Sequence, residues 1–347
     1  MLVNVVKLIL SLAVILMGAE IFTNGVEWLG KKLKLSEGAV GSLLAAVGTA
    51  LPETMIPVIA ILFGTSGGEA GGHGGGHEIG IGAILGAPFM LSTLAMFVSG
   101  MAVIYHRKKR GNYPVMNVNP VVMERDLKFF LIVYSIAILA AFLPTHNLKM
   151  FVIIFLVAAY GYYVYLTLTD PCPDDGDEEH LAECYFDKVF TKSGNDPVLG
   201  IIITQVIFAL GLIVLGANFF VQSIGFMADV FGVPAFVLSL IIAPIATELP
   251  EKFNSVIWIA QGKDTLALGN ITGAMVFQSS LIPALGIALT DWNLTTGALI
   301  SAVLAIASSL IIYSQLKMRN VVTPYTLVIG GVFYLVFISM VFLGLIH

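Results

Sequence analysis

The stretch IATELPEKFNS, residues 245–255, places three ionisable side chains inside a segment that otherwise reads as an apolar helix. Glu248, Glu251 and Lys252 surround Pro250 there. Within a membrane, charged groups are costly, and they usually pair with one another or face a water-filled cavity. If the chain crosses a membrane, this stretch is therefore a candidate functional site.

The composition places the chain in a membrane. Of its 347 residues, 58% are hydrophobic and only 11% are charged, and the mean hydropathy is +0.94. A soluble domain carries about 25% charged residues. The uncharged runs are long enough to cross a bilayer as helices and too long for the strands of a barrel. We therefore predict an all-α integral membrane protein, and we interpret the apolar segment 2–28 as a first spanning helix because it lacks the cleavage site of a signal peptide.

Hydropathy predicts ten transmembrane helices. Their expected bounds are 2–28, 36–64, 79–105, 128–144, 149–169, 198–228, 233–261, 265–289, 295–315 and 321–346. Of the 17 Lys and Arg residues, 14 fall in alternate loops, which the positive-inside rule assigns to the cytoplasm. We expect a multi-pass protein of the cell membrane with both termini outside and the loop 170–197 in the cytoplasm.

The stretch at residues 245–255 has a counterpart in the first half of the chain. At an offset of 198 residues, LPE at 51–53 falls on LPE at 249–251, and Thr49 falls on Thr247. The following helices align at an offset of 187, and the difference of 11 is the length of the insert GGEAGGHGGGH at 67–77. The chain therefore contains an internal repeat.

The repeat predicts the domain organisation. Because each half contains five helices, the second half must be inverted relative to the first. We expect one five-helix repeat at 1–169, an acidic loop at 170–197 and a second repeat at 198–347. The repeated motifs occupy 45–57, 82–91, 243–255 and 269–280.

The repeated Leu-Pro-Glu predicts an ion site. Each proline removes a backbone donor and should break or kink its helix, which frees carbonyl oxygens near Thr49 and Thr247. Inverted symmetry would bring Glu53 and Glu251 together at the membrane midplane. Two carboxylates with carbonyl oxygens suit a hard divalent cation such as Ca²⁺. The alternative is that both glutamates are protonated or ion-paired and have a structural role.

GTALPE at 48–53 and ATELPE at 246–251 resemble the repeats of the calcium/cation antiporter superfamily, nearest to its sodium/calcium exchanger branch. The resemblance extends over the ten-helix layout. It implies a secondary antiporter whose first and sixth helices slide across the other eight. It also implies a Ca²⁺ site made by Glu53, Glu251, Thr49 and Thr247.

The chain departs from the family pattern at the positions to which the resemblance would assign sodium ligands. The replacements there are Ala50, Ala87, Leu91, Glu248, Ala274 and Gln278, while Asn254, Ser255 and Asn270 keep polar side chains. Proton/calcium exchangers of the same superfamily carry an Ala-Thr-Glu-Leu sequence similar to residues 246–249. Both Na⁺ and H⁺ thus remain candidates for the coupling ion.

Glu248 and Lys252 are four residues apart and can pair on one helix face. This pair is either a structural ion pair or part of the coupling site, with Lys252 as a tethered cation or Glu248 as a proton carrier. Glu20, in the first span, is a candidate for a cation entrance on the cation pathway, and the alternative is a snorkelled or lumen-facing role.

The loops carry weaker signals. The acidic loop could bind a metal through Cys172, His180 and Cys184, but a solvated linker is the preferred interpretation. The glycine-rich insert could bind a metal through His73, His77 and Glu78, but a flexible loop explains its glycine-rich composition better. The basic run HRKKR at 106–110 is expected to lie beside anionic lipid.

Other classes of function find little support in the sequence. All six histidines and both cysteines lie in predicted loops or at the terminus, and there is no His-Glu-x-x-His pattern, nucleophile elbow or nucleotide-binding loop. We expect no enzyme activity, no cofactor, no use of ATP and no nucleic-acid partner, only membrane lipid and transported cations. A cation channel remains the less favoured alternative, and the oligomeric state is open.

Overall fold

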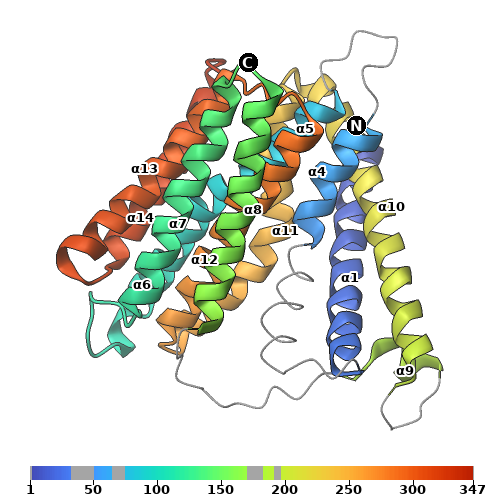
Figure 1. Cartoon of the computed structure of the whole chain (residues 1–347). Coiled ribbons are helices and arrows are strands. Elements are labelled where there is room, and N and C mark those ends of the chain that lie inside the picture. The colour runs from blue at the N-terminus through green and yellow to red at the C-terminus, as the bar shows by residue number, and fades with distance from the viewer. Residues whose placement is uncertain (1, 33–50, 65–74, 170–182, 191–196, 347) are drawn as a thin grey trace.

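The computed structural model describes residues 2–32, 51–64, 75–169, 183–190 and 197–346, and these residues form a helical bundle without strands (Figure 1). Several predicted site residues lie outside this range, namely Thr49, His73, Cys172 and His180. For Glu251, which is part of a described helix, only the backbone is described.

Described helices overlap each of the predicted spans, and residues 36–50 of the second predicted span lie outside the described part of the chain. Their bounds are α1 Leu2–Lys32, α4 Leu51–Phe63, α5 Gly76–Met90, α6 Met96–Tyr105, α7 Pro120–Leu139, α8 His146–Thr169, α9 Tyr185–Phe190, α10 Leu199–Phe231, α11 Ala235–Ala260, α12 Asp264–Leu289, α13 Thr296–Arg319 and α14 Pro324–Phe342. A π-helical turn, Leu91–Ala95, joins α5 to α6 into one continuous span. In the described part of the chain, seven helical segments are long and apolar enough to cross a membrane. The segments α4, α7 and α11 are not among these seven.

The fourth predicted span begins earlier than its hydropathy indicated. The Asn119 side chain accepts hydrogen bonds from the backbone N–H groups of Val121 and Val122, and Pro120 occupies the first turn of α7. An Asn cap followed by proline is a strong helix start. The predicted bound at residue 128 is therefore wrong by two turns, and Arg125, expected in a loop, lies within α7.

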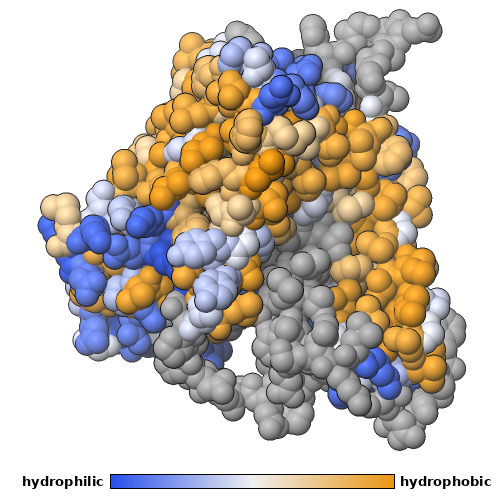
Figure 2. All heavy atoms as spheres, in the orientation of Figure 1, coloured by the Kyte–Doolittle hydropathy of each residue, from blue (hydrophilic) through white to orange (hydrophobic). Residues whose placement is uncertain are grey.

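The surface suits a lipid environment. Figure 2 shows hydrophobic residues across the middle of the molecule, with hydrophilic residues gathered toward its ends. Large apolar side chains are exposed on outer helices, including Ile9, Phe151 and Leu335. Exposed apolar surface on this scale indicates contact with lipid rather than water.

The loops that carry most of the basic residues meet at one end of the bundle. Arg110, in the loop after α6, forms an ion pair with Asp264 at the start of α12. Lys317, in the last turn of α13, pairs with Glu124 of α7 at 2.6 Å. In Figure 1 these contacts lie at the lower end, whereas α1 begins and α14 ends at the upper end.

Helices α1 and α10 form a pair at the edge of the bundle (Figure 1). A Cβ atom added to Gly18 would lie 2.9 Å from Ile213, and one added to Gly216 would lie 2.7 Å from Ile15. The two helices therefore approach through their glycines, as small residues permit. The two helices share two apolar clusters, one of which also includes residues of α4, α5 and α11, and both are separate from the large core that α5, α7, α12 and α13 build.

Of the break or kink predicted at Pro250, the break is absent, because helix α11 continues from Ala235 to Ala260 without interruption. A proline removes only one hydrogen bond of a helix, so long helices tolerate it by bending. In the first repeat, the described part of α4 covers Leu51–Phe63.

Candidate ion-binding site

A polar cluster lies buried between α11 and α12. Glu248 Oε2 lies 3.4 Å from Lys252 Nζ, and Glu248 Oε1 accepts a hydrogen bond of 3.0 Å from Gln278 Nε2. The three residues are between 2% and 5% exposed. The predicted pairing of Glu248 with Lys252 is confirmed, and Gln278 joins it from the neighbouring helix.

Close backbone contact between α5 and α11 positions this cluster. A Cβ atom on Gly82 would lie 2.4 Å from the carbonyl oxygen of Phe236, and one on Gly86 would lie 2.3 Å from that of Leu240. The hydroxyl of Ser239 donates a 2.7 Å hydrogen bond to the carbonyl of Ile79. No side chain could fit between these backbones, so the glycines of α5 set the position of α11.

Glu53 and Thr247 are also buried, at 7% and 3% exposure. Glu53 lies on α4. Thr247 donates its hydroxyl to the carbonyl of Ala243 at 3.1 Å, which leaves its oxygen lone pairs able to accept. Because α4 packs against both α11 and α12, buried carboxylates are present on neighbouring helices of this region.

The remaining predicted coupling residues are dispersed. Ser255 is buried and donates to the carbonyl of Ala267 at 3.2 Å, which ties α11 to α12. Asn254 is exposed on α11, and Asn270 is half-buried on α12. The structure thus brings Gln278 to the cluster, whereas Asn254 lies at the surface.

Glu20 lies at the surface of α1 and contacts the linker between the repeats. Its Oε1 atom accepts a hydrogen bond of 2.9 Å from the hydroxyl of Tyr185, in α9. This hydrogen bond raises the pKa of Tyr185. Glu20 is therefore exposed on α1 and is not part of the buried cluster between α11 and α12.

A buried carboxylate that the sequence analysis missed lies on α7. Asp126 accepts a 2.6 Å hydrogen bond from Thr272 of α12 and a 3.1 Å one from Tyr163 of α8, with Arg125 Nε at 3.5 Å. It is 2% exposed. The Asn119–Pro120 start signal, had it been used, would have placed Asp126 inside a helix.

Arg110 has a structural role rather than the lipid-facing one expected of the run HRKKR. Its guanidinium donates two 2.7 Å hydrogen bonds to Asp264 and one of 2.6 Å to the carbonyl of Ile259. Asp264 also accepts from the backbone N–H of Asn117 at 2.8 Å. Bidentate pairing of this kind is strong and directional, so it fixes the loop after α6 to the start of α12.

Cys184, a candidate metal ligand, is instead part of a hydrogen-bond network. Its thiol donates to Gln205 Oε1 at 3.2 Å, and the same oxygen accepts from the backbone N–H of Phe186 at 2.9 Å. Gln205 Nε2 donates to Asn24 Oδ1 and to the carbonyl of Ile21, both at 2.9 Å. Among the described residues, no group of three His, Cys, Asp or Glu side chains could hold a metal.

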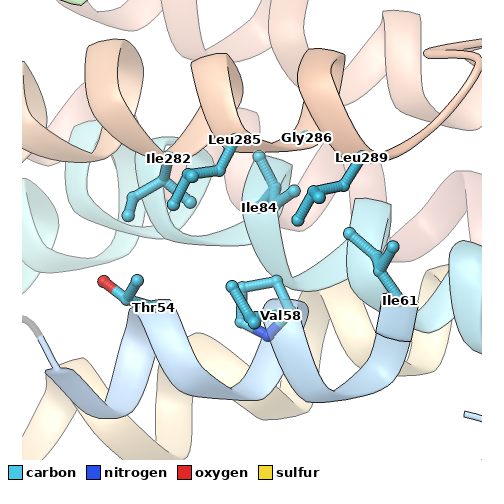
Figure 3. A pocket seen from close by; sticks show the side chains of 9 residues that line it. Thr54, Val58, Ile61, Ile84, Ile282, Leu285, Gly286 and Leu289 are labelled. Atoms are coloured by element: carbon cyan, nitrogen blue, oxygen red, sulfur yellow. The ribbon is translucent and has the colours of Figure 1, made fainter. Parts of the chain in front are cut away.

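An apolar pocket separates part of α4 from α12. The space is too small to admit a water molecule, and Thr54 supplies the polar side chain of its lining. Figure 3 shows Thr54 and Val58 of α4 facing Ile282, Leu285 and Leu289 of α12 across this space. Apolar side chains of α4 and α12 therefore face each other beside the turn that carries Glu53.

Together, the bundle and its buried charges define a multi-pass membrane protein with an ionisable cluster between its helices. The chain belongs to the sodium/calcium exchanger protein family, whose sequence pattern matches residues 3–169 and 201–344. This is a family of cation exchangers and not of enzymes, which agrees with the resemblance read from the Leu-Pro-Glu repeats.

Known relatives agree with this assignment. The chain is 24% identical over 312 residues to MaX1, a sodium/calcium exchanger of Methanosarcina acetivorans, and the match covers 81% of each chain. Its fold is similar to that of the H⁺/Ca²⁺ exchanger CAX, with a TM-score of 0.68, 18% identity and coverage of 97% of this chain and 81% of that one. The sodium-calcium exchanger NCX_Mj matches with a TM-score of 0.54 and 17% identity, covering 97% and 98% of the two chains.

Proposed function

We propose that this protein is a secondary antiporter that exchanges a divalent cation, Ca²⁺ first among them, for Na⁺ or H⁺ by alternating access. The observation that carries the proposal is the burial of carboxylates, Glu53 and Glu248, on the neighbouring helices α4 and α11. Buried carboxylates in a membrane mark ion pathways. The relatives, which include exchangers coupled to Na⁺ and to H⁺ by their names, agree with this chemistry.

The proposed architecture has ten transmembrane helices in two inverted repeats, with both termini outside. It is supported by the contacts between α1 and α10. Gly18 and Gly216 are 198 residues apart, as are their contact residues Ile15 and Ile213, and each glycine packs against the other helix's isoleucine. A two-fold axis between the repeats would produce this reciprocal pattern.

The proposed Ca²⁺ ligands are Glu53 and Glu251, with oxygens of Thr49 and Thr247. The burial of Glu53 and Thr247 supports half of this set. Carboxylate and carbonyl oxygens are the ligands that Ca²⁺ prefers. The pair α1 and α10 is the proposed mobile element, because its helices meet through glycines and its apolar clusters, although they reach α4, α5 and α11, are separate from the large core.

The proposed coupling region is the cluster of Glu248, Lys252 and Gln278. The cluster contains a buried carboxylate and a buried ammonium. It therefore differs both from an apolar contact between helices and from a site made only of neutral oxygen ligands. The cluster therefore makes H⁺ a serious rival to Na⁺ as the coupling ion.

The test uses purified full-length protein in lipid vesicles. Uptake of radioactive Ca²⁺ is measured with an outward Na⁺ gradient and, separately, with a pH gradient. We expect saturable uptake with at least one gradient and none in the Glu53→Gln and Glu251→Gln variants. Near-normal exchange in either variant would remove that residue from the site, and gradient-independent flux that does not saturate would favour a channel.

A further inference from the structure

The cluster between α11 and α12 contains a positive charge where a transported or coupling cation would otherwise be required. Lys252 is 5% exposed, and its Nζ atom lies 3.4 Å from the carboxylate of Glu248, itself 2% exposed. A buried carboxylate needs a compensating charge, since isolation in a medium of low polarity is strongly unfavourable. Here the protein supplies that charge from its own chain.

The second observation is an oxygen atom without a donor. Gln278 donates its amide nitrogen to Glu248 Oε1 at 3.0 Å, and this fixes which side of the amide faces the carboxylate. Its other atom, Oε1, is buried without a hydrogen-bond partner among the described residues. Buried polar atoms usually find a partner, so an unsatisfied carbonyl oxygen in this place is an acceptor available to a group that donates or is positively charged.

These oxygens have the chemistry of a site for a small hard cation. A carboxylate and an amide carbonyl are oxygen ligands of the kind that such cations prefer. Lys252 reaches the carboxylate from the same helix, one turn away, so its ammonium occupies the position of such a cation without leaving the protein.

We propose that the Lys252 ammonium is a built-in substitute for a bound Na⁺ ion at the Glu248 carboxylate, so that the protein needs no Na⁺ there. Only the consequence of this inference for transport rests on the proposed antiport function. In transport, the tethered charge would return with the carrier in every cycle, so exchange would need one fewer monovalent cation from solution.

The proposal predicts that removing the ammonium creates a Na⁺ site. In Lys252→Met the side chain keeps its length and loses its charge, which leaves Glu248 without this partner. Lys252→Gln is the second variant, because its amide retains a hydrogen bond to Glu248. The measurement is the unfolding temperature of the purified full-length protein in detergent, in NaCl and in choline chloride of equal ionic strength. Binding of radioactive Na⁺ to the same samples gives an independent readout.

We expect both variants to be less stable than the wild-type protein in choline. In Na⁺ their unfolding temperature should rise by several degrees, saturably, and Na⁺ should bind in a saturable manner. The wild-type protein should show neither effect at this site. The double variant Glu248→Gln with Lys252→Met, which removes both charges, should lose the Na⁺ effect again.

The matched control is Arg110→Met, which removes the cation from another buried pair. Its loss of stability should be the same in both salts. The proposal is overturned if the wild-type protein and the Lys252 variants respond equally to Na⁺, or if the folded variants do not respond. It is also overturned if the variants can be purified in neither salt, because Na⁺ then fails to replace the ammonium. These readouts do not depend on Ca²⁺ transport, so failure of the antiport proposal would be seen separately, in the vesicle experiment.

Discussion

Gly18 and Gly216 are reciprocal partners in one helix crossing, since each packs against the isoleucine three residues before the other. A Cβ atom on Gly18 would also meet the carbonyl of Ala209 at 3.2 Å, and one on Gly216 would meet that of Ser11 at 3.0 Å. All three pairs of equivalent positions are 198 residues apart. The α1–α10 contact therefore depends on the absence of two side chains at matching points of the repeat.

The first prediction concerns this crossing. Gly216→Ala should destabilise the protein by about 1–3 kcal/mol through overpacking and should slow transport, because the added methyl group presses on Ile15. The measurement is the unfolding temperature together with the initial rate of Ca²⁺ uptake. Gly211→Ala is the control on the same helix, because a Cβ atom there meets nothing within 4 Å. The control should be neutral or stabilised by up to about 1 kcal/mol, and equal losses in both variants would contradict the prediction.

The second prediction concerns the loop after α6. Asp264→Asn removes the charge that faces Arg110, and breaking a buried ion pair by removing one partner costs about 3–5 kcal/mol. Thermal unfolding in detergent should show this loss. Lys317→Met breaks the more exposed pair with Glu124, and it should cost less than about 1 kcal/mol. If the two variants lose similar stability, the Arg110–Asp264 pair between the loop and α12 contributes no more to stability than an exposed ion pair.

The third prediction concerns Asp126. Tyr163→Phe and Thr272→Val each remove one donor to its carboxylate, and each should cost about 1–3 kcal/mol because the acceptor remains buried. Because the two donors share one acceptor, the double variant should deviate from additivity. Tyr162→Phe, next in the chain and 57% exposed, is the control and should change stability little. Unfolding curves of the four proteins test this, and a strictly additive result would show that the hydrogen bonds act independently.

The fourth prediction concerns the docking of α9. Gln205→Leu removes the amide that joins α9 to α1, so Cys184, now 3% exposed, should become accessible. The rate of maleimide labelling, measured in a Cys172→Ser background, should rise at least several-fold. Thr204→Val, which removes an exposed hydroxyl from the neighbouring position of α10, should leave the rate unchanged. Unchanged labelling in Gln205→Leu would show that apolar packing alone holds α9 in place.

The sequence by itself predicted an all-helical membrane protein and showed an internal repeat, because both are recorded along the chain. Long apolar runs mark the helices, and the offset that aligns the two Leu-Pro-Glu motifs also relates the equivalent positions in the α1–α10 crossing. The i and i+4 spacing of Glu248 and Lys252 likewise predicted their ion pair, since both lie on one helix. Local spacing failed at α7, where hydropathy concealed a capped helix start, and at Pro250, where the helix continues.

Only the tertiary structure decided which polar groups meet across helices. Gln278 reaches Glu248 from 30 residues away, Thr272 reaches Asp126 from 146, and Arg110 reaches Asp264 from 154. Each contact depends on how two helices are rotated and spaced, which the glycine contacts and the packing of the whole bundle determine. A pattern along a single helix gives the face that a side chain occupies, but the partner facing it is set by the packing of the other helices.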